Sequence, residues 1–244
     1  MPSTFLTAEW RKLIMAQYAV DPATLAPWLP PGVELDLFDG VCYVSLVGFL
    51  FDRVRLKGVP VPFHTRFEEV NLRFYVRRTE PDGTRKRGVV FIRELVPRAA
   101  ITIVANTLYE EPYATVPTRH RIVNTPQSLN VSYDWRYKGL WQSVAVEAAP
   151  TPEPIPVGSD AEFITEHYFG YTKRSRGSTS EYAVQHPRWL VYPILRHRIV
   201  ADFAALYGPA FASLRRQPPA SVLLAEGSEI SVSSGMRLPA EFSV

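Results

Sequence analysis

Residues 67–77 constrain the fold most, because their side chains alternate between polar and apolar from Glu69 to Val76. A period of two residues is the pattern of a β-strand with one apolar face. The opposite face carries an acid, an amide, a guanidinium and a phenol within about 20 Å of strand, and it could orient a small polar or acidic ligand if it lines a cavity. The simpler interpretation is the solvated outer face of an antiparallel sheet. The polar side chains are Glu69, Asn71, Arg73 and Tyr75, and the apolar ones are Val70, Leu72, Phe74 and Val76.

The proline content indicates a chain of many short elements. There are 22 prolines in 244 residues, well above the usual share of about 5%, which disfavours long helices. An apolar fraction of 46% is enough to bury a large core, and β-rich folds of this length often form one domain. We therefore expect one β-rich domain over residues 1–244.

The charges favour neither a nucleic-acid nor a membrane partner. A net charge of +3 comes from 22 arginines and 5 lysines against 24 acids, and the longest basic run is Arg85–Arg87. The longest apolar run, residues 41–51, is far short of the roughly 20 residues that span a bilayer. The lone Cys42 and the lack of a charged segment followed by a long apolar stretch at the N-terminus suit the cytoplasm.

Cap and turn signals divide the first part of the chain. Asp21-Pro22 fits a helix N-cap followed by proline at the first helical position, and Pro30 must stop that helix. Asp39-Gly40 is a two-residue hairpin signal, so it predicts that residues 33–37 pair with a strand beginning at Val41.

The rest of the chain alternates hairpins with short helices. Pro81-Asp82-Gly83 predicts a turn from the central strand into an antiparallel partner. The other expected elements follow from periodicity and breaker residues. They are a strand at 88–96, a helix at 97–109 ended by Pro112, a hairpin of 129–137 and 140–149, a helix after Ser159-Asp160, short strands within 171–189, a helical segment at 202–216 and a strand at 221–238 kinked at Gly227.

Familiar catalytic signatures are missing from the sequence. It contains no dinucleotide-binding glycine motif, P-loop, Gly-x-Ser-x-Gly or His-Glu-x-x-His. The five histidines are far apart, and no pair has the short spacing of metal ligands. We therefore assign no cofactor and no metal site.

A set of ordered motifs resembles the DUF2071 (YqjF-like) family of uncharacterised bacterial proteins, which is grouped with the acetoacetate decarboxylase-like superfamily. The resemblance covers most of the chain. It implies an α+β fold, a closed cone-like antiparallel β-barrel with helices packed around it and the active site inside. The motifs are Trp10-Arg11-x-Leu13, Tyr18-x-Val20-Asp21, Leu25, Leu29-Pro30-x-Gly32-Val33, Asp39-Gly40, Phe67-x-Glu69-Val70-Asn71-x-Arg73-x-Tyr75-Val76, Pro112-Tyr113, Gly170-Tyr171 and His186-Pro187-Arg188-Trp189.

The resemblance also implies roles for two residues. In the decarboxylases an arginine precedes a Tyr-x-x-Asp element by seven residues, and Arg11 has the same separation from Tyr18. A glutamate of their central strand corresponds to Glu69. Arg11 could then clamp a carboxylate ligand with Glu69 near its reacting end, or the two could form a structural ion pair.

One departure from the decarboxylase pattern removes an activity. Those enzymes form a Schiff base through the first lysine of a Pro-Lys-Lys element, whereas this sequence has Pro112-Tyr113-Ala114 at the corresponding place. Tyrosine cannot form an imine, so decarboxylation by that route is not expected. Lys12 and Lys173 are the only lysines in the family-like stretches.

Two functions remain open from the sequence. One is a small-molecule enzyme that uses acid/base chemistry at Glu69 on a small acidic or carbonyl-containing metabolite. The other is a non-catalytic protein that binds such a molecule in the same pocket, and homo-oligomers are compatible with both. His186 could be a general base or could bond backbone in a turn. The candidate residues are Glu69 and Arg11 for catalysis and Asn71, Arg73, Tyr113 and His186 for ligand binding.

Overall fold

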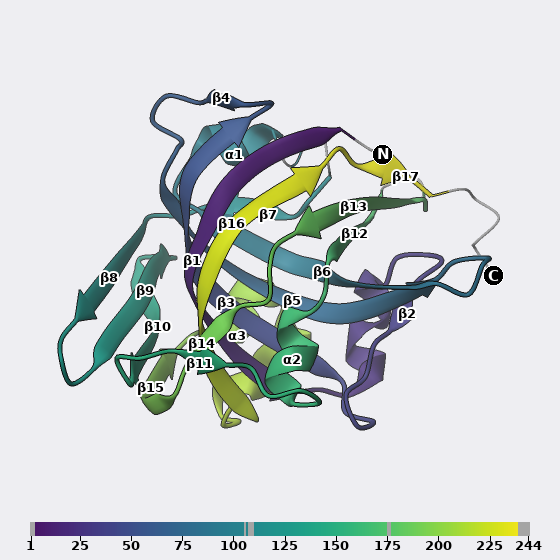
Figure 1. The fold of residues 1–244 in the computed structure, drawn as a ribbon. Helices are drawn as coiled ribbons and strands as arrows, with labels where there is room; N and C mark the ends of the chain where they lie inside the picture. Colours follow the sequence, from purple (N-terminus) through teal and green to yellow (C-terminus); the bar gives the residue numbers. More distant parts are fainter. Residues whose placement is uncertain (1–2, 105, 107–109, 175–176, 239–244) are drawn as a thin grey trace.

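The structure is a computed structural model that describes residues 3–104, 106, 110–174 and 177–238. It is mostly sheet, with few and short helices (Figure 1). The larger sheet is ring-like, because its pairings run from β16 through β1, β3, β5, β6, β12 and β13 and then return to β16. The ring strands are β1 (Thr4–Ala19), β3 (Tyr43–Leu56), β5 (Phe67–Thr79), β6 (Arg85–Val96), β12 (Phe169–Lys173), β13 (Thr179–Gln185) and β16 (Ser221–Ser233).

Short strands extend this sheet at its margins. β6 pairs in parallel with both β7 and β12, so the sheet is not antiparallel throughout as expected. The short strands are β2 (Glu34–Leu35), β4 (Val59–Pro60), β7 (Tyr113–Thr115), β11 (Glu153–Pro154), β14 (Leu190–Tyr192) and β17 (Met236–Arg237).

A second sheet of four strands lies beside the ring (Figure 1). Glu68, on β5, ties the two sheets together, because its carboxylate bonds His120 Nδ1 at 2.5 Å and accepts a 2.7 Å hydrogen bond from the Thr118 hydroxyl. These bonds outweigh its burial and lower its pKa to about 2. The strands of this sheet are β8 (Thr118–Asn124), β9 (Leu129–Tyr137), β10 (Leu140–Ala148) and β15 (Ile194–Val200).

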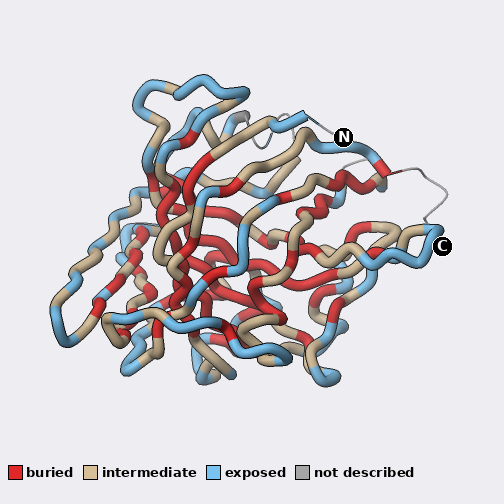
Figure 2. The backbone as a smooth tube through the Cα atoms, viewed as in Figure 1, coloured by how far each residue is buried: buried red, intermediate tan, exposed pale blue. Residues whose placement is uncertain are grey.

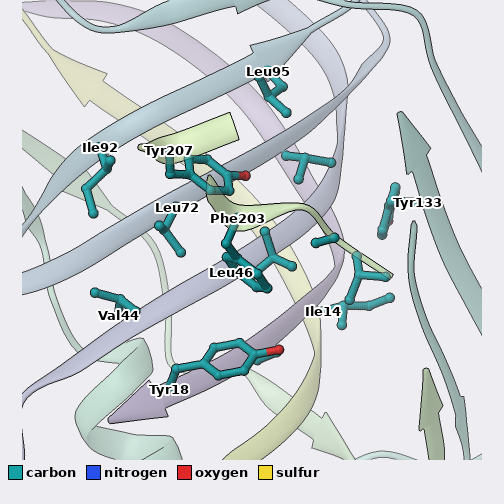
Figure 3. Packing of buried hydrophobic residues seen from close by; sticks show 14 of the residues in the cluster. Ile14, Tyr18, Val44, Leu46, Leu72, Ile92, Leu95, Tyr133, Phe203 and Tyr207 are labelled. Carbon is teal, nitrogen blue, oxygen red and sulfur yellow. The ribbon is translucent and has the colours of Figure 1, made fainter. Parts of the chain in front are cut away.

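The apolar face of β5 packs outward from the ring. Leu72 lies in one buried cluster with Phe203 and Tyr207 of a C-terminal helix (Figure 3), and fully burying such a side chain contributes about 1.5–3 kcal/mol. The backbone of the ring strands is accordingly buried over much of its length (Figure 2). The helices are η1 (Pro22–Trp28), α1 (Ala99–Val104), α2 (Asp160–Thr165), α3 (Phe203–Tyr207) and η3 (Pro209–Arg215).

Most sequence-predicted elements are present. The hairpins β5–β6 and β9–β10 are confirmed, as are the N-caps at Asp21 and Ser159 and the break between α3 and η3. The kink at Gly227 is confirmed by its φ of +80°.

Two predictions about the first half of the chain were wrong in detail. Asp39-Gly40 does turn the chain, with a bridge between Phe38 and Val41, but the preceding strand β2 pairs with β5 instead of β3. The helix expected at 97–109 is α1, Ala99–Val104, and residues 105 and 107–109 lie outside the described part of the chain. None of the helices in the described residues is both long and apolar enough to cross a membrane.

Candidate functional site

A cavity of about 270 Å³ lies inside the ring. All seven ring strands contribute residues to its wall, so the cavity lies in the interior of the ring. The volume is near the lower end of ligand pockets and suits a small metabolite. Most of the wall is apolar, and it includes Trp10, Leu13, Val47, Phe49, Phe51, Val89 and Trp189.

The polar face of β5 lines this cavity. Glu69, Asn71 and Arg73 are 3%, 1% and 9% exposed, and all three belong to the cavity wall. The alternation of the strand therefore places its polar face inside and its apolar face outside, against the simpler expectation of a solvated face.

The strand register gathers further polar groups beside Asn71. Asn71 lies opposite Glu94 on β6, and Glu94 in turn pairs with Tyr113 on β7. Residues that are directly opposite project to the same side of a sheet, so these three side chains form a row across three strands. Glu111 lies two residues before Tyr113, and it also lines the cavity.

Glu69 has a hydrogen-bond donor on each of its oxygens. Asn71 Nδ2 donates to Oε1 at 2.9 Å, and the Tyr113 hydroxyl donates to Oε2 at 3.3 Å. Burial raises the pKa of Glu69 to about 7; the bond from Asn71 opposes this shift and the neighbouring Glu111 adds to it. A carboxyl group with this pKa can both accept and release a proton near neutral pH.

Two more carboxyl groups with raised pKa values share the cavity wall. Burial raises the pKa of Glu111 to about 7 despite a hydrogen bond with Tyr182. Burial, followed by the charges of Glu111 and Glu69, raises the pKa of Glu94 well above its usual range. We call Glu69, Asn71, Glu94 and Glu111 the acid end of the cavity. Sequence reasoning missed Glu94, Glu111 and Tyr182.

Gly170 makes room for Tyr182. A Cβ atom at position 170 would lie 2.1 Å from Cζ of Tyr182, the residue that pairs with it across β12 and β13. The absence of a side chain at Gly170 therefore lets the phenol lie over the backbone and bond Glu111. Gly170 belongs to one of the family-like motifs in the sequence.

Arg73 is a buried cation without a carboxylate partner among the described residues. Its Nη2 lies 3.7 Å from Met15 Sδ, its guanidinium lies 5.7 Å from the centre of the Tyr75 ring, and its Nε has no hydrogen-bond partner. Burying a guanidinium without an acceptor is unfavourable by several kcal/mol. An anionic or carbonyl group in the cavity would satisfy it.

Arg11 was expected in the cavity, and the structure places it elsewhere. Its guanidinium bonds Glu9 at 2.8 Å and is 33% exposed, in a separate surface hollow that also includes Arg53. Its neighbour Trp10 lines the cavity, so the alternation of β1 turns Arg11 away from it, and a bulge at Lys12, which has a φ of +52°, then brings Leu13 to the cavity side. Trp10 and Leu13 point into the cavity instead, and Arg11 forms no ion pair with Glu69.

Neither of the two lysines singled out from the sequence reaches the cavity. Lys12 bonds the Tyr192 hydroxyl at 2.7 Å and Glu226, and Lys173 donates to the Pro27 carbonyl at 3.0 Å. The cavity wall contains no lysine in the part of the chain that the structure describes.

Three histidines line the cavity, and they are His64, His167 and His186. His186 stacks on Trp189 with ring centres 4.1 Å apart, and its Nδ1 lies 2.9 Å from the Pro187 carbonyl, as in a turn-stabilising role. His167 bonds Asp36 through Nε2 at 3.1 Å, and burial lowers its pKa to about 4. His167 and His186 both stay neutral at pH 7 because burial lowers the pKa of each.

The carboxylates and histidines do not form a metal centre. Within the described residues, no three side chains of His, Cys, Asp or Glu lie close enough to hold a metal ion. The chemistry that the site offers by itself is proton transfer by buried carboxyl groups, hydrogen bonding by two phenols and attraction of an anion by one arginine.

Comparison with known proteins agrees with this architecture. The model of the DUF2071 family, described as an uncharacterised conserved protein, matches residues 7–229. The chain belongs to this family. It is similar to the uncharacterised protein YqjF of Bacillus subtilis, with 29% identity over 105 residues, which are 43% of this chain and 41% of that protein.

Solved structures show the same fold. The acetoacetate decarboxylase of Legionella pneumophila superimposes with a TM-score of 0.65 at 13% identity, over 98% of this chain and 88% of that one. The enduracididine biosynthesis enzyme MppR complexed with pyruvate gives a TM-score of 0.63 at 13% identity, over 99% of this chain and 92% of that one. The fold is therefore similar to that of acetoacetate decarboxylase-like proteins.

Proposed function

We propose that this ring-like sheet acts as a closed barrel and that its interior binds a small, largely apolar molecule carrying a carboxylate or carbonyl group. The observation that carries the proposal is Arg73, which has no carboxylate partner among the described residues and lines the same cavity as Glu69. Arg73 would hold the anionic or carbonyl oxygen, and the apolar wall would contain the carbon skeleton. The likeness to a protein solved with pyruvate supports a ligand of this size and chemistry.

The proposed chemistry is proton transfer beside a carbonyl group. Glu69, with a pKa of about 7, would take a proton from the carbon next to the carbonyl. The phenol of Tyr113, or the protonated carboxyl of Glu94, would donate a hydrogen bond to the oxygen that becomes negative. No imine is required in this scheme, which suits a cavity whose described wall has no lysine.

The alternative is a binding protein without catalysis. It is favoured by the two donors on Glu69, since Asn71 and Tyr113 occupy both carboxyl oxygens when no ligand is present. Each of these bonds favours the charged carboxylate and lowers its pKa, so a base that is held in this way is a weaker proton acceptor.

Solvent exchange distinguishes the two functions. The protein is incubated in deuterium oxide near neutral pH with pyruvate, 2-oxobutanoate or acetoacetate, and loss of the C–H signal beside the carbonyl is followed by proton NMR. Catalysis predicts exchange above the uncatalysed rate in the wild type and its loss in Glu69→Gln, which keeps the bond from Asn71. Binding without exchange would contradict the catalytic scheme and leave the alternative, whereas absence of binding by any small acid or ketone would contradict both.

A further inference from the structure

The acid end of the cavity holds three carboxyl groups and no cation. Glu69 and Glu94 are buried and Glu111 is partly buried, and no lysine, arginine or histidine of the described chain lies within 4 Å of any of the three carboxyl groups. Buried carboxyl groups are ordinarily paired or bonded. Here each group has only phenol or amide donors, and the charge of Arg73, which favours ionised Glu69, is a smaller effect than burial.

Three hydrogen-bond acceptors at the acid end also lack a donor. Asn71 Oδ1, Glu94 Oε2 and Glu111 Oε1 are buried and have no hydrogen-bond partner. They come from β5, from β6 and from the segment before β7, and all three residues line the cavity. Asn71 is an amide that is 1% exposed, so its free oxygen indicates a missing donor independently of the charges. A buried acceptor without a donor is unfavourable by about 1–3 kcal/mol.

We propose that the acid end binds a protonated primary amine, so that the ligand carries an ammonium group in addition to the carboxylate or carbonyl group held by Arg73. An ammonium group has three donors and no acceptor, which matches the three free acceptors in number and kind. This assignment rests on the proposed function, because it names the second polar group of the same ligand.

The strand geometry limits the length of this ligand. Asn71 and Arg73 are two residues apart on β5 and point to the same side, which separates their Cα atoms by roughly 7 Å. An ammonium group at Asn71 and a carboxylate at Arg73 are therefore bridged by a chain of about three to five carbons. The class of ligand is a short amino acid or amino ketone whose two polar groups lie at opposite ends.

Binding of such a ligand must be linked to protons. The ammonium charge favours ionised carboxyl groups, so Glu69 and Glu111, whose pKa values are about 7 in the free protein, would release protons on binding. The other titratable or charged groups of the cavity wall are Glu94, Tyr113, Tyr182, Arg73, His64, His167 and His186. Burial lowers the pKa of His167 and of His186, so these two histidines are neutral above pH 7 and Glu69 and Glu111 contribute more to the linkage there.

The test compares acids that differ only in the amino group. Butanoate, pentanoate and hexanoate are titrated against 4-aminobutanoate, 5-aminopentanoate and 6-aminohexanoate by calorimetry between pH 6 and pH 8.5. We expect the amino group to strengthen binding at least about tenfold for the best chain length at pH 8. Affinity of the amino acid should rise with pH by up to about tenfold per unit near pH 7, whereas that of the plain acid should fall. Buffers of different ionisation enthalpy should report proton release for the amino acid alone.

Variants locate the effect at the acid end. Glu94→Gln and Glu111→Gln keep the shape of a protonated glutamic acid, and in each variant the ratio of 5-aminopentanoate affinity to pentanoate affinity should lose most of the gain seen in the wild type. Glu153→Gln changes an exposed acid on β11 and is the matched control. A quaternary analogue, 5-(trimethylammonio)pentanoate, has the charge without N–H donors and should bind more weakly than 5-aminopentanoate.

The possible results separate the two proposals. If plain acids bind and the amino group gives no gain, or the gain survives in both Gln variants, the ammonium assignment is wrong while the proposed function stands. If neither series binds, the proposed function is wrong as well. Equal affinity for the quaternary analogue would show that the charge alone is recognised, and this would overturn the match between the ammonium donors and the three free acceptors.

Discussion

Asn71 Nδ2 donates a 2.9 Å hydrogen bond to Oε1 of Glu69, the residue two positions earlier on the same strand and on the same face. This bond holds the carboxyl group in a fixed orientation inside the cavity and favours its charged form. Burial acts in the opposite direction and is the larger effect, so the pKa of Glu69 rises to about 7. The balance makes the ionisation of Glu69 sensitive to any ligand near it.

The raised pKa of Glu69 should make the protein less stable as the pH rises. A group whose pKa is higher in the folded than in the unfolded protein binds extra protons on folding, so its contribution is complete below pH 4.5 and is lost as the pH rises through about 7. For Glu69 alone the loss is at most about 3 kcal/mol. Urea unfolding at pH 6.5 and pH 8.5 should show a smaller decrease in Glu69→Gln than in the wild type. An equal decrease in both proteins would show that Glu69 titrates as an ordinary surface acid.

Arg73 and Arg11 should differ in what they do for ligands. Arg73→Met removes a buried guanidinium without a carboxylate partner, so we expect unchanged or higher thermal stability and loss of the stabilisation by pentanoate. Arg11→Met removes a partly exposed ion pair with Glu9, which still bonds Arg53 at 2.8 Å, and should change stability by less than about 1 kcal/mol. Thermal shifts with pentanoate measure both effects. Loss of the ligand effect in Arg11→Met alone would restore Arg11 as the clamp.

Schiff-base trapping should fail. Tyr113 stands where the decarboxylase resemblance places the imine lysine, and Lys12 and Lys173 bond Tyr192 and Pro27 away from the cavity. Incubation with acetoacetate or pyruvate and borohydride should therefore leave the intact mass unchanged. A stable adduct mapped to either lysine by peptide mass spectrometry would be incompatible with the site described above.

Gly170→Ala should disturb the acid end from outside it. The new methyl group would overlap the Tyr182 ring, so the ring must move. Glu111 then loses its hydrogen bond with Tyr182, which lowers the pKa of Glu111 in the wild type. We expect a loss of about 1–3 kcal/mol in unfolding free energy and weaker binding of small acids. Adding Tyr182→Leu should make the cost of Gly170→Ala much smaller, because the overlap is then removed. Additive losses in the double variant would refute this explanation of the glycine.

The sequence predicted the part of the site that a regular strand carries. Glu69, Asn71 and Arg73 follow from the alternation of β5, because a period of two residues fixes which side chains share a face. The family resemblance pointed to the same strand. His186 and Tyr113 also line the cavity, as expected from their motifs.

Irregular strands explain what the sequence did not predict. If the pairing of β5 with β6 continued without a bulge from the turn at residues 80–84, Arg93 would lie opposite Asn71. The register instead shifts by one residue between Leu72 and Arg73, so Glu94 lies opposite Asn71. Glu94 therefore enters the cavity, and Arg93 leaves it to bond the Leu206 carbonyl at 2.6 Å. In β1 the bulge at Lys12 likewise breaks the alternation, so Trp10 and Leu13 face the cavity and Arg11 does not. Bulges depend on the packing of neighbouring strands, so no local pattern marks them.

The central claim is that a small acid or ketone binds inside the ring against Arg73 and Glu69. A crystal structure of the protein soaked with 2-oxobutanoate tests it most directly. The account predicts density for the molecule in the cavity, with its carboxylate within hydrogen-bond distance of the Arg73 guanidinium and its carbon chain among the apolar side chains. Density only in the surface hollow beside Arg11, with the ring interior unoccupied at a saturating concentration, would contradict it.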